Sequence, residues 1–153
     1  MLTDFYGNHL TTSTGLARDS YDIGLRAFLS ANYGAQEAFS QAIEADPNFA
    51  LAYLGLARAF MSSGRVAYAK AALGKAKNLL KGVNDREKSH FLCCELILLG
   101  EAKKARTAVQ NHVSEWPRDA MVAQMNTSVF GLIGFSGEAG RETDLLEYTA
   151  KLL

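Results

Sequence analysis

Proline and β-branched runs are scarce in this sequence, and their absence favours helix. Only Pro47 and Pro117 occur among the 153 residues, so long segments are free of the residue that breaks helices most strongly. Alanine is abundant, and it has the highest helix propensity of all residues. We therefore predict an all-α chain.

Cysteine and long apolar segments are also scarce. Cys93 and Cys94 are adjacent, which is too few and too close for a disulfide framework, so a reducing compartment such as the cytoplasm is expected. The longest apolar stretch runs from Phe91 to Leu99 and is interrupted by Glu95, far short of the roughly 20 residues that span a bilayer. The first ten residues lack the pattern of a secretory signal. No membrane association is predicted.

Net charge gives no sign of a nucleic-acid partner. Sixteen basic residues balance sixteen acidic ones, so no electrostatic attraction to nucleic acid or an acidic membrane is expected. Lys70, Lys77 and Lys81 follow one helix face, but no aromatic residues are interleaved with them. They are better explained as a solvated outer face.

Turn signals divide the chain into an arm and a series of helices. Residues 1–14 are polar and turn-rich and form a predicted irregular arm, whose Thr14 can cap the first helix. Asn84 followed by Glu87 predicts a capping box, with a helix that starts at Asp85. The breaks together predict eight helices of roughly 11–17 residues.

The breaks recur with a period typical of tetratricopeptide repeats. Pro47 and Lys81 are 34 residues apart, the length of one such two-helix unit. Small residues at Ala57, Ala69 and Ala76 fit the positions where its helices approach closely. We predict a right-handed superhelix of four antiparallel hairpins, at about 15–47, 49–82, 85–117 and 119–153.

The chain further resembles one branch of this superfamily, the tetratricopeptide-repeat protein thirty-eight family. The resemblance rests on four segments: Leu10-Thr11-Thr12-Ser13, Ala45 to Ala52, Asp85 to His90, and Trp116 to Ala120. It implies a helical repeat protein without established catalytic residues. Because members of that family are longer, the resemblance implies that this chain is the N-terminal part of a longer array. Its C-terminal helices are then expected to be exposed or to form a homo-oligomer with another copy.

The inner groove of such an array is lined by the first helix of each hairpin. The positions expected in this groove are Leu51, Leu54, Arg58, Met61, Glu87, His90, Cys94, Leu98, Met121, Gln124 and Met125. They are largely apolar and lack the lysine and asparagine set that grips a carboxylate in some relatives. We therefore predict a non-catalytic scaffold that binds a protein, as a peptide or a helix, in an apolar groove. The alternative is an assembly module whose groove packs on the rest of its own chain or on another copy.

Glu87, His90 and Cys94 raise two chemical alternatives. Their spacing of i, i+3 and i+7 on one helix face suits metal ligands, and His90 with Cys94 resembles a base and its nucleophile. A second matching ligand pair is missing, as are an oxyanion device and a third orienting group. The sequence therefore predicts no metal, no cofactor and no catalytic residue.

Glycine recurs every three residues near the C-terminus, at Gly131, Gly134, Gly137 and Gly140. This spacing is not that of a phosphate-binding loop, and no strand precedes it. We expect a flexible connection into the last helix.

Overall fold

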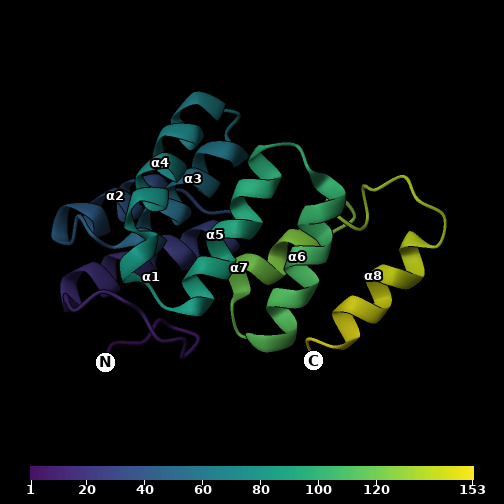
Figure 1. Ribbon diagram of the computed structural model, residues 1–153, viewed down its shortest axis with the longest axis horizontal. Helices are drawn as coiled ribbons and strands as arrows, with labels where there is room; N and C mark the ends of the chain where they lie inside the picture. Colours follow the sequence, from purple (N-terminus) through teal and green to yellow (C-terminus); the bar gives the residue numbers. More distant parts are fainter. The chain divides into compact units, whose positions relative to one another are not determined.

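The computed structural model describes all 153 residues and contains eight α-helices and no strand (Figure 1). The all-α prediction is confirmed. The chain divides into two compact units, residues 1–91 and residues 92–153. No helix has both the length and the apolar character needed to cross a membrane.

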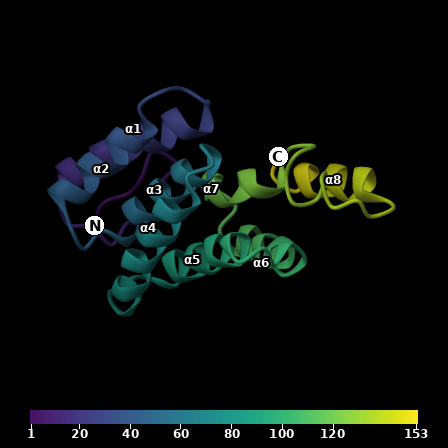
Figure 2. The same ribbon diagram turned by 90° about the horizontal axis from the view of Figure 1, so that it is seen from above.

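The first unit consists of two helical hairpins, an N-terminal arm and the start of a further helix. Its helices are α1 (Gly15–Leu29), α2 (Ala35–Ala45), α3 (Ala50–Ser62), α4 (Val66–Leu79) and the first part of α5 (Asp85–Leu98). A 3-10 turn, Leu80–Gly82, extends α4. Helix α1 packs on α2, α2 on α3, and α3 on α4, as Figure 2 shows. The first two predicted hairpins correspond to the pairs α1–α2 and α3–α4.

The first helix of each hairpin ends in the same way. Ala31, Gly64 and Gly100 follow α1, α3 and α5 with left-handed backbone angles, φ of 54°, 74° and 74°. After α1, the amide of Asn32 donates to the carbonyl of Ala27 at 2.8 Å, and the equivalent bond closes the other two helices. This is the Schellman ending, which normally places glycine at the left-handed position. The first hairpin is the exception because alanine occupies that position.

Ala31→Gly is therefore expected to stabilise the chain. A left-handed alanine costs about 1–2 kcal/mol, part of which is offset because glycine gives the unfolded chain more freedom. We expect a gain of about 0.5–1 kcal/mol in the free energy of unfolding, measured by urea denaturation. Ala71→Gly, at an exposed position inside α4, is the control and should lose about 1 kcal/mol. A loss at both positions would contradict the strain assigned to Ala31.

The core of the first unit is centred on the ring of Phe39 in α2. This side chain is fully buried and lies 5.7 Å from the ring of Tyr21, measured between centroids. Gly24 of α1 and Gly55 of α3 face the same ring, and an added Cβ would come within 2.7 Å and 2.5 Å of it, respectively. Three helices thus meet at one aromatic side chain because two of them have no side chain there. The predicted small positions Ala57, Ala69 and Ala76 are buried as well.

Two predicted helix caps have different outcomes. Asn84 caps α5 as predicted, because its Oδ1 accepts the amide hydrogen of Glu87 at 2.9 Å, and the helix begins at Asp85. Thr14 precedes α1 as predicted, but its side chain makes no capping hydrogen bond. The amide of Thr14 donates to Oγ1 of Thr12 at 3.2 Å.

The second unit contains the rest of α5, α6 (Ala102–Glu115), α7 (Ala120–Ala123) and α8 (Arg141–Ala150). Helix α6 is held to the start of α7 by a buried pair, because His112 Nε2 lies 3.2 Å from Asp119 Oδ2. The ring of Trp116 lies 5.0 Å from the His112 ring, measured between centroids. His112 therefore serves as a packing and hydrogen-bonding group.

The fourth predicted hairpin departs most from expectation. In place of a helix of roughly 11–17 residues, α7 has four residues and continues only as a 3-10 turn, Gln124–Asn126. Residues with hydroxyl side chains follow this turn, and their hydroxyl groups compete with backbone amides for the backbone carbonyl groups. Thr127 Oγ1, for example, donates to the carbonyl of Gln124 at 3.1 Å.

The glycine-rich segment after α7 is closely wound. An added Cβ at Gly134 would lie 2.6 Å from Cα of Val129, and one at Gly131 would lie 2.8 Å from the carbonyl oxygen of Met125. Gly137 and Gly140 have left-handed backbones, with φ of 72° and 81°. The prediction of a flexible connection does not include these close contacts. The spacing of the glycines does not indicate which backbone atoms lie next to each of them.

Helix α8 is attached to the rest of the second unit by Tyr148. Its hydroxyl donates to the carbonyl of Ala123 at 2.8 Å, and its side chain is buried. Burial raises the pKa of Tyr148 above its usual value, and the nearby Cys93 adds to this effect. The neutral phenol is thus the form that the folded chain holds.

Candidate functional site

The N-terminal arm is irregular, as predicted, but its internal hydrogen bonds give it a fixed form. Asp4 Oδ1 accepts the amides of Tyr6 at 3.0 Å and Asn8 at 2.8 Å. An isolated bridge pairs Thr3 with His9 across this turn. The carboxylate of Asp4 therefore closes a tight loop that carries Phe5 and Tyr6 at its tip.

The end of the arm is attached to the start of α5. Oε1 of Glu87 accepts the amide of Thr11 at 2.8 Å, and Nη2 of Arg86 donates to the carbonyl of His9 at 3.0 Å. Thr12 adds a hydrogen bond to Oδ2 of Asp46, just after α2. Three hydrogen bonds between residues distant in sequence thus hold the arm against the start of α5 and the end of α2.

The tip of the arm lies against α1. The amide of Phe5 donates to Oδ1 of Asp22 at 2.9 Å, and the guanidinium of Arg26 lies 5.1 Å from the centroid of the Phe5 ring. Burial raises the pKa of Asp22, and the hydrogen bond from Phe5 opposes that rise. Two successive turns of α1 therefore position one aromatic side chain.

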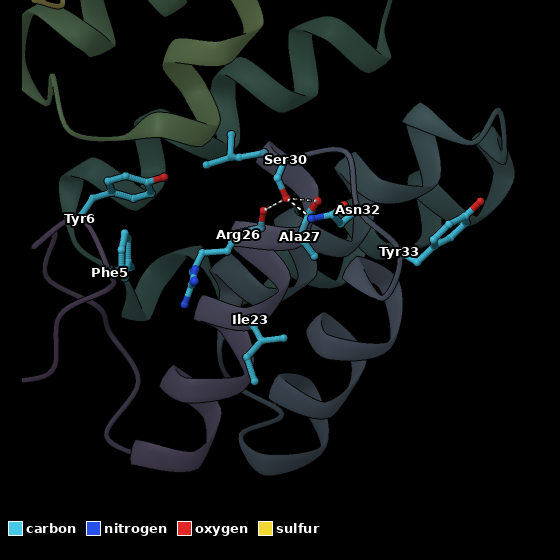
Figure 3. Close-up of a pocket in the computed structure, with 9 residues that line it drawn as sticks. Phe5, Tyr6, Ile23, Arg26, Ala27, Ser30, Asn32 and Tyr33 are labelled. Atoms are coloured by element: carbon cyan, nitrogen blue, oxygen red, sulfur yellow. Dashed lines mark hydrogen bonds between the residues drawn. The ribbon is translucent and has the colours of Figure 1, made fainter.

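A groove of about 720 Å³ lies between this tip and the last turns of α1 (Figure 3). Phe5 and Tyr6 line one end, Ile23 and Arg26 line the middle, and Tyr33 lies at the other end. The exposed fractions of Phe5, Ile23 and Tyr33 are 60%, 61% and 104%. Large apolar side chains so exposed around one hollow are typical of an interaction site.

The groove has a polar edge where α1 ends. Ser30 Oγ donates to the carbonyl of Arg26 at 2.7 Å, and Nδ2 of Asn32 donates to Ser30 Oγ at 2.9 Å (Figure 3). The left-handed turn at Ala31 lies between these two residues. The Schellman ending of α1 therefore also shapes this edge of the groove.

Most of the groove positions expected from the repeat pattern are covered by the chain itself. Eight of the eleven side chains are buried: Leu51, Leu54, Arg58, Glu87, His90, Cys94, Met121 and Met125. Met61 and Leu98 are half-buried, and Gln124 is exposed. The arm covers one of the buried positions, since Oε1 of Glu87 accepts the amide of Thr11. For all eleven positions, a binding role stays a prediction.

Glu87, His90 and Cys94 are buried on α5. Glu87 Oε1 is occupied by the amide of Thr11 and by Nδ2 of Asn84, at 2.8 Å and 3.3 Å. No group of three His, Cys, Asp or Glu side chains has the arrangement of a metal site. The hydrogen bonds of Glu87 give it a structural role, which is to anchor the arm.

Glu87 also gives the chain a pH-dependent stability. Burial raises its pKa above the usual value, while the hydrogen bonds from Thr11 and the charge of Arg86 counteract part of the rise. The folded chain thus holds this proton more tightly than the unfolded chain does. Ionisation of Glu87 consequently costs stability, and the cost develops as pH rises from the usual glutamate pKa through the raised pKa of the folded chain.

Glu87→Gln is expected to remove this cost while keeping an oxygen that accepts the Thr11 amide. The stability of the variant relative to the natural chain should therefore be highest at neutral pH and should fall as the pH is lowered towards the usual glutamate pKa. Urea unfolding of both chains over a pH series measures the difference and cancels the other titrating groups. A difference that is constant with pH, or that grows on acidification, would contradict the raised pKa.

The sequence pattern contains one signal for the observed groove. Leu16 and Ile23 are seven residues apart on α1 and are 67% and 61% exposed, while the buried face of this helix carries Tyr21 and Leu25. A second apolar stripe of this kind marks an interaction face. The contribution of Phe5 has no local signal, because it depends on hydrogen bonds to residues distant in sequence.

Comparison with known proteins agrees with the repeat pattern. Residues 34–89 match the family model described as a tetratricopeptide repeat, and this span covers α2, α3, α4 and the start of α5. No curated protein and no solved structure matched the chain. The matched span contains the hairpin α3–α4 and the Schellman ending at Gly64. Residues 34–89 are therefore similar to a tetratricopeptide repeat.

Proposed function

We propose that this chain is a non-catalytic scaffold that binds a segment of another protein in the groove between the arm and α1. Tetratricopeptide repeats generally mediate protein–protein interactions and are not catalytic. The observation that supports this site is the cluster of exposed Phe5, Ile23 and Tyr33 around one hollow. The buried thiols of Cys93 and Cys94 form no disulfide, which supports a cytoplasmic location.

The lining of the groove favours an apolar peptide segment over a small polar molecule. The hollow of about 720 Å³ is lined by large exposed apolar side chains, which a segment with apolar side chains can bury. The groove runs along the last two turns of α1, so an extended segment or one face of a short helix can follow it. Burying Ile23 and Phe5 supplies the affinity.

Selection from a library of displayed peptides tests this proposal. Peptides enriched on the immobilised chain should bind Ile23→Glu at least tenfold more weakly, because a charge in the groove must be desolvated. Val66→Glu is the matched control, since Val66 is an exposed apolar residue on α4 of the same unit but does not line the groove. Absence of enrichment, or equal losses in both variants, would refute the proposal.

Assembly with another copy is the alternative function, and it rests on a different surface. In the second unit, Phe130, Phe135 and Leu146 are 82%, 77% and 70% exposed. Light scattering at two concentrations measures self-association. A mass that doubles with concentration, and that Phe130→Ser with Phe135→Ser restores to that of one chain, would favour assembly over the scaffold function.

A further inference from the structure

We propose that the groove recognises a partner segment in which an aspartate or glutamate side chain lies next to a large apolar one. The carboxylate would bind Arg26, and the apolar side chain would contact Ile23 and Phe5. This inference rests on the proposed function of the groove and names the chemistry of its partner.

The first support is the unpaired charge of Arg26. Arg26 and Asp22 are four residues apart on α1, a spacing that commonly allows an ion pair. Asp22 instead accepts the amide of Phe5 at 2.9 Å, and the charged contact of Arg26 is with the ring of Phe5. The exposed guanidinium of Arg26 thus has no carboxylate partner within the chain.

The second support is the way in which Arg26 is held. Its guanidinium lies 5.1 Å from the Phe5 ring centroid, a distance at which the cation is attracted to the ring. A stacked guanidinium keeps the N–H groups at its edge available for a carboxylate in the same plane. The ring therefore holds Arg26 in place beforehand, which lowers the entropy lost when a carboxylate binds.

The third support is charge complementarity across the whole groove. Arg26 is the only charged residue that lines it, and the others are apolar or neutral. An exposed ion pair alone contributes little, so the apolar contacts must supply most of the affinity. The charge then selects among apolar segments, since a segment with lysine or arginine at this point is repelled and one with a carboxylate is favoured.

An internal acidic side chain fits this site better than a chain terminus. Recognition of a terminal carboxylate requires several converging donors, whereas this groove offers a single guanidinium. The nearest side-chain amide, Nδ2 of Asn32, already donates to Ser30 Oγ at 2.9 Å. One bidentate contact with one carboxylate is what a single arginine supplies.

The test compares binding by the full chain and by Arg26→Gln. The probes are the strongest-binding library peptide, synthesised with both ends capped, and a version in which its acidic residue is replaced by the matching amide. Fluorescence anisotropy should show about two- to fivefold weaker binding of the amide version to the natural chain, and equal binding of both versions to Arg26→Gln. Arg26→Glu should reverse the preference in a library selection, towards peptides with lysine or arginine.

Other outcomes separate this inference from the proposed function. Enriched peptides that lack acidic residues, yet lose binding with Ile23→Glu, would refute recognition by Arg26 and leave the groove function intact. A preference for the free carboxyl terminus over the capped end would also overturn the inference. Peptides that bind but are insensitive to Ile23→Glu would refute the proposed function itself.

Discussion

Gly55→Ala is expected to lower the free energy of unfolding by about 1–3 kcal/mol, the usual cost of overpacking a core. The added Cβ would lie 2.5 Å from Cε1 of Phe39, closer than any real contact. The ring is fully buried and cannot withdraw, because Gly24 of α1 packs so closely on its other side that a Cβ added there would lie 2.7 Å from Cδ1 of Phe39. Chemical denaturation followed by circular dichroism measures the loss.

The control for Gly55→Ala is Gly74→Ala in α4. No atom lies within 4 Å of a Cβ added at Gly74, so this variant should gain about 1 kcal/mol through helix propensity. Opposite signs at two helical glycines would isolate the steric cause. If Phe39→Leu in the Gly55→Ala background restores no stability, the assignment of Phe39 as the obstructing side chain fails.

Ile133→Ala is expected to lower the free energy of unfolding by about 2–5 kcal/mol, the range for removing a buried isoleucine side chain. Ile133 lies in the irregular segment between α7 and α8, yet its side chain is fully buried. The variant leaves a cavity beneath a segment that contains no regular helix. The amides of this segment should therefore exchange with solvent faster, which hydrogen exchange measures directly.

Val129→Ala is the matched control for Ile133→Ala. Val129 belongs to the same segment, but its side chain is 63% exposed, so its removal should change stability by less than about 0.5 kcal/mol. Equal and small effects at both positions would show that Ile133 does not anchor the segment.

The first six helices are predictable because their signals are local. Asn84 caps α5 through a hydrogen bond to a residue three positions away, and Pro47 ends α2 by steric conflict with its neighbour. Gly64 and Gly100 supply the left-handed turns that close α3 and α5. Signals of this kind act over a few residues, so they can be recognised from the sequence without knowledge of the tertiary structure.

The short α7 and the observed groove could not be predicted in this way. In the segment that follows α7, backbone atoms pack closely against Gly131 and Gly134, and packing of this kind has no periodic signature in the sequence. The groove requires the arm, whose attachment joins Thr11 to Glu87, 76 positions apart. Positions inferred from an ideal repeat, such as Leu54 and His90, are buried in the folded chain.

The long reach of that attachment has a consequence for synthesis of the chain. α1 and α2 can form as soon as they leave the ribosome, since helix formation is local and fast. Phe5 belongs to an arm whose far end forms hydrogen bonds with Arg86 and Glu87. These two residues are translated much later than the arm. In a nascent chain that has not yet exposed Glu87, the far end of the arm is therefore unattached, and the contacts of Phe5 with Asp22 and Arg26 alone hold its tip on α1.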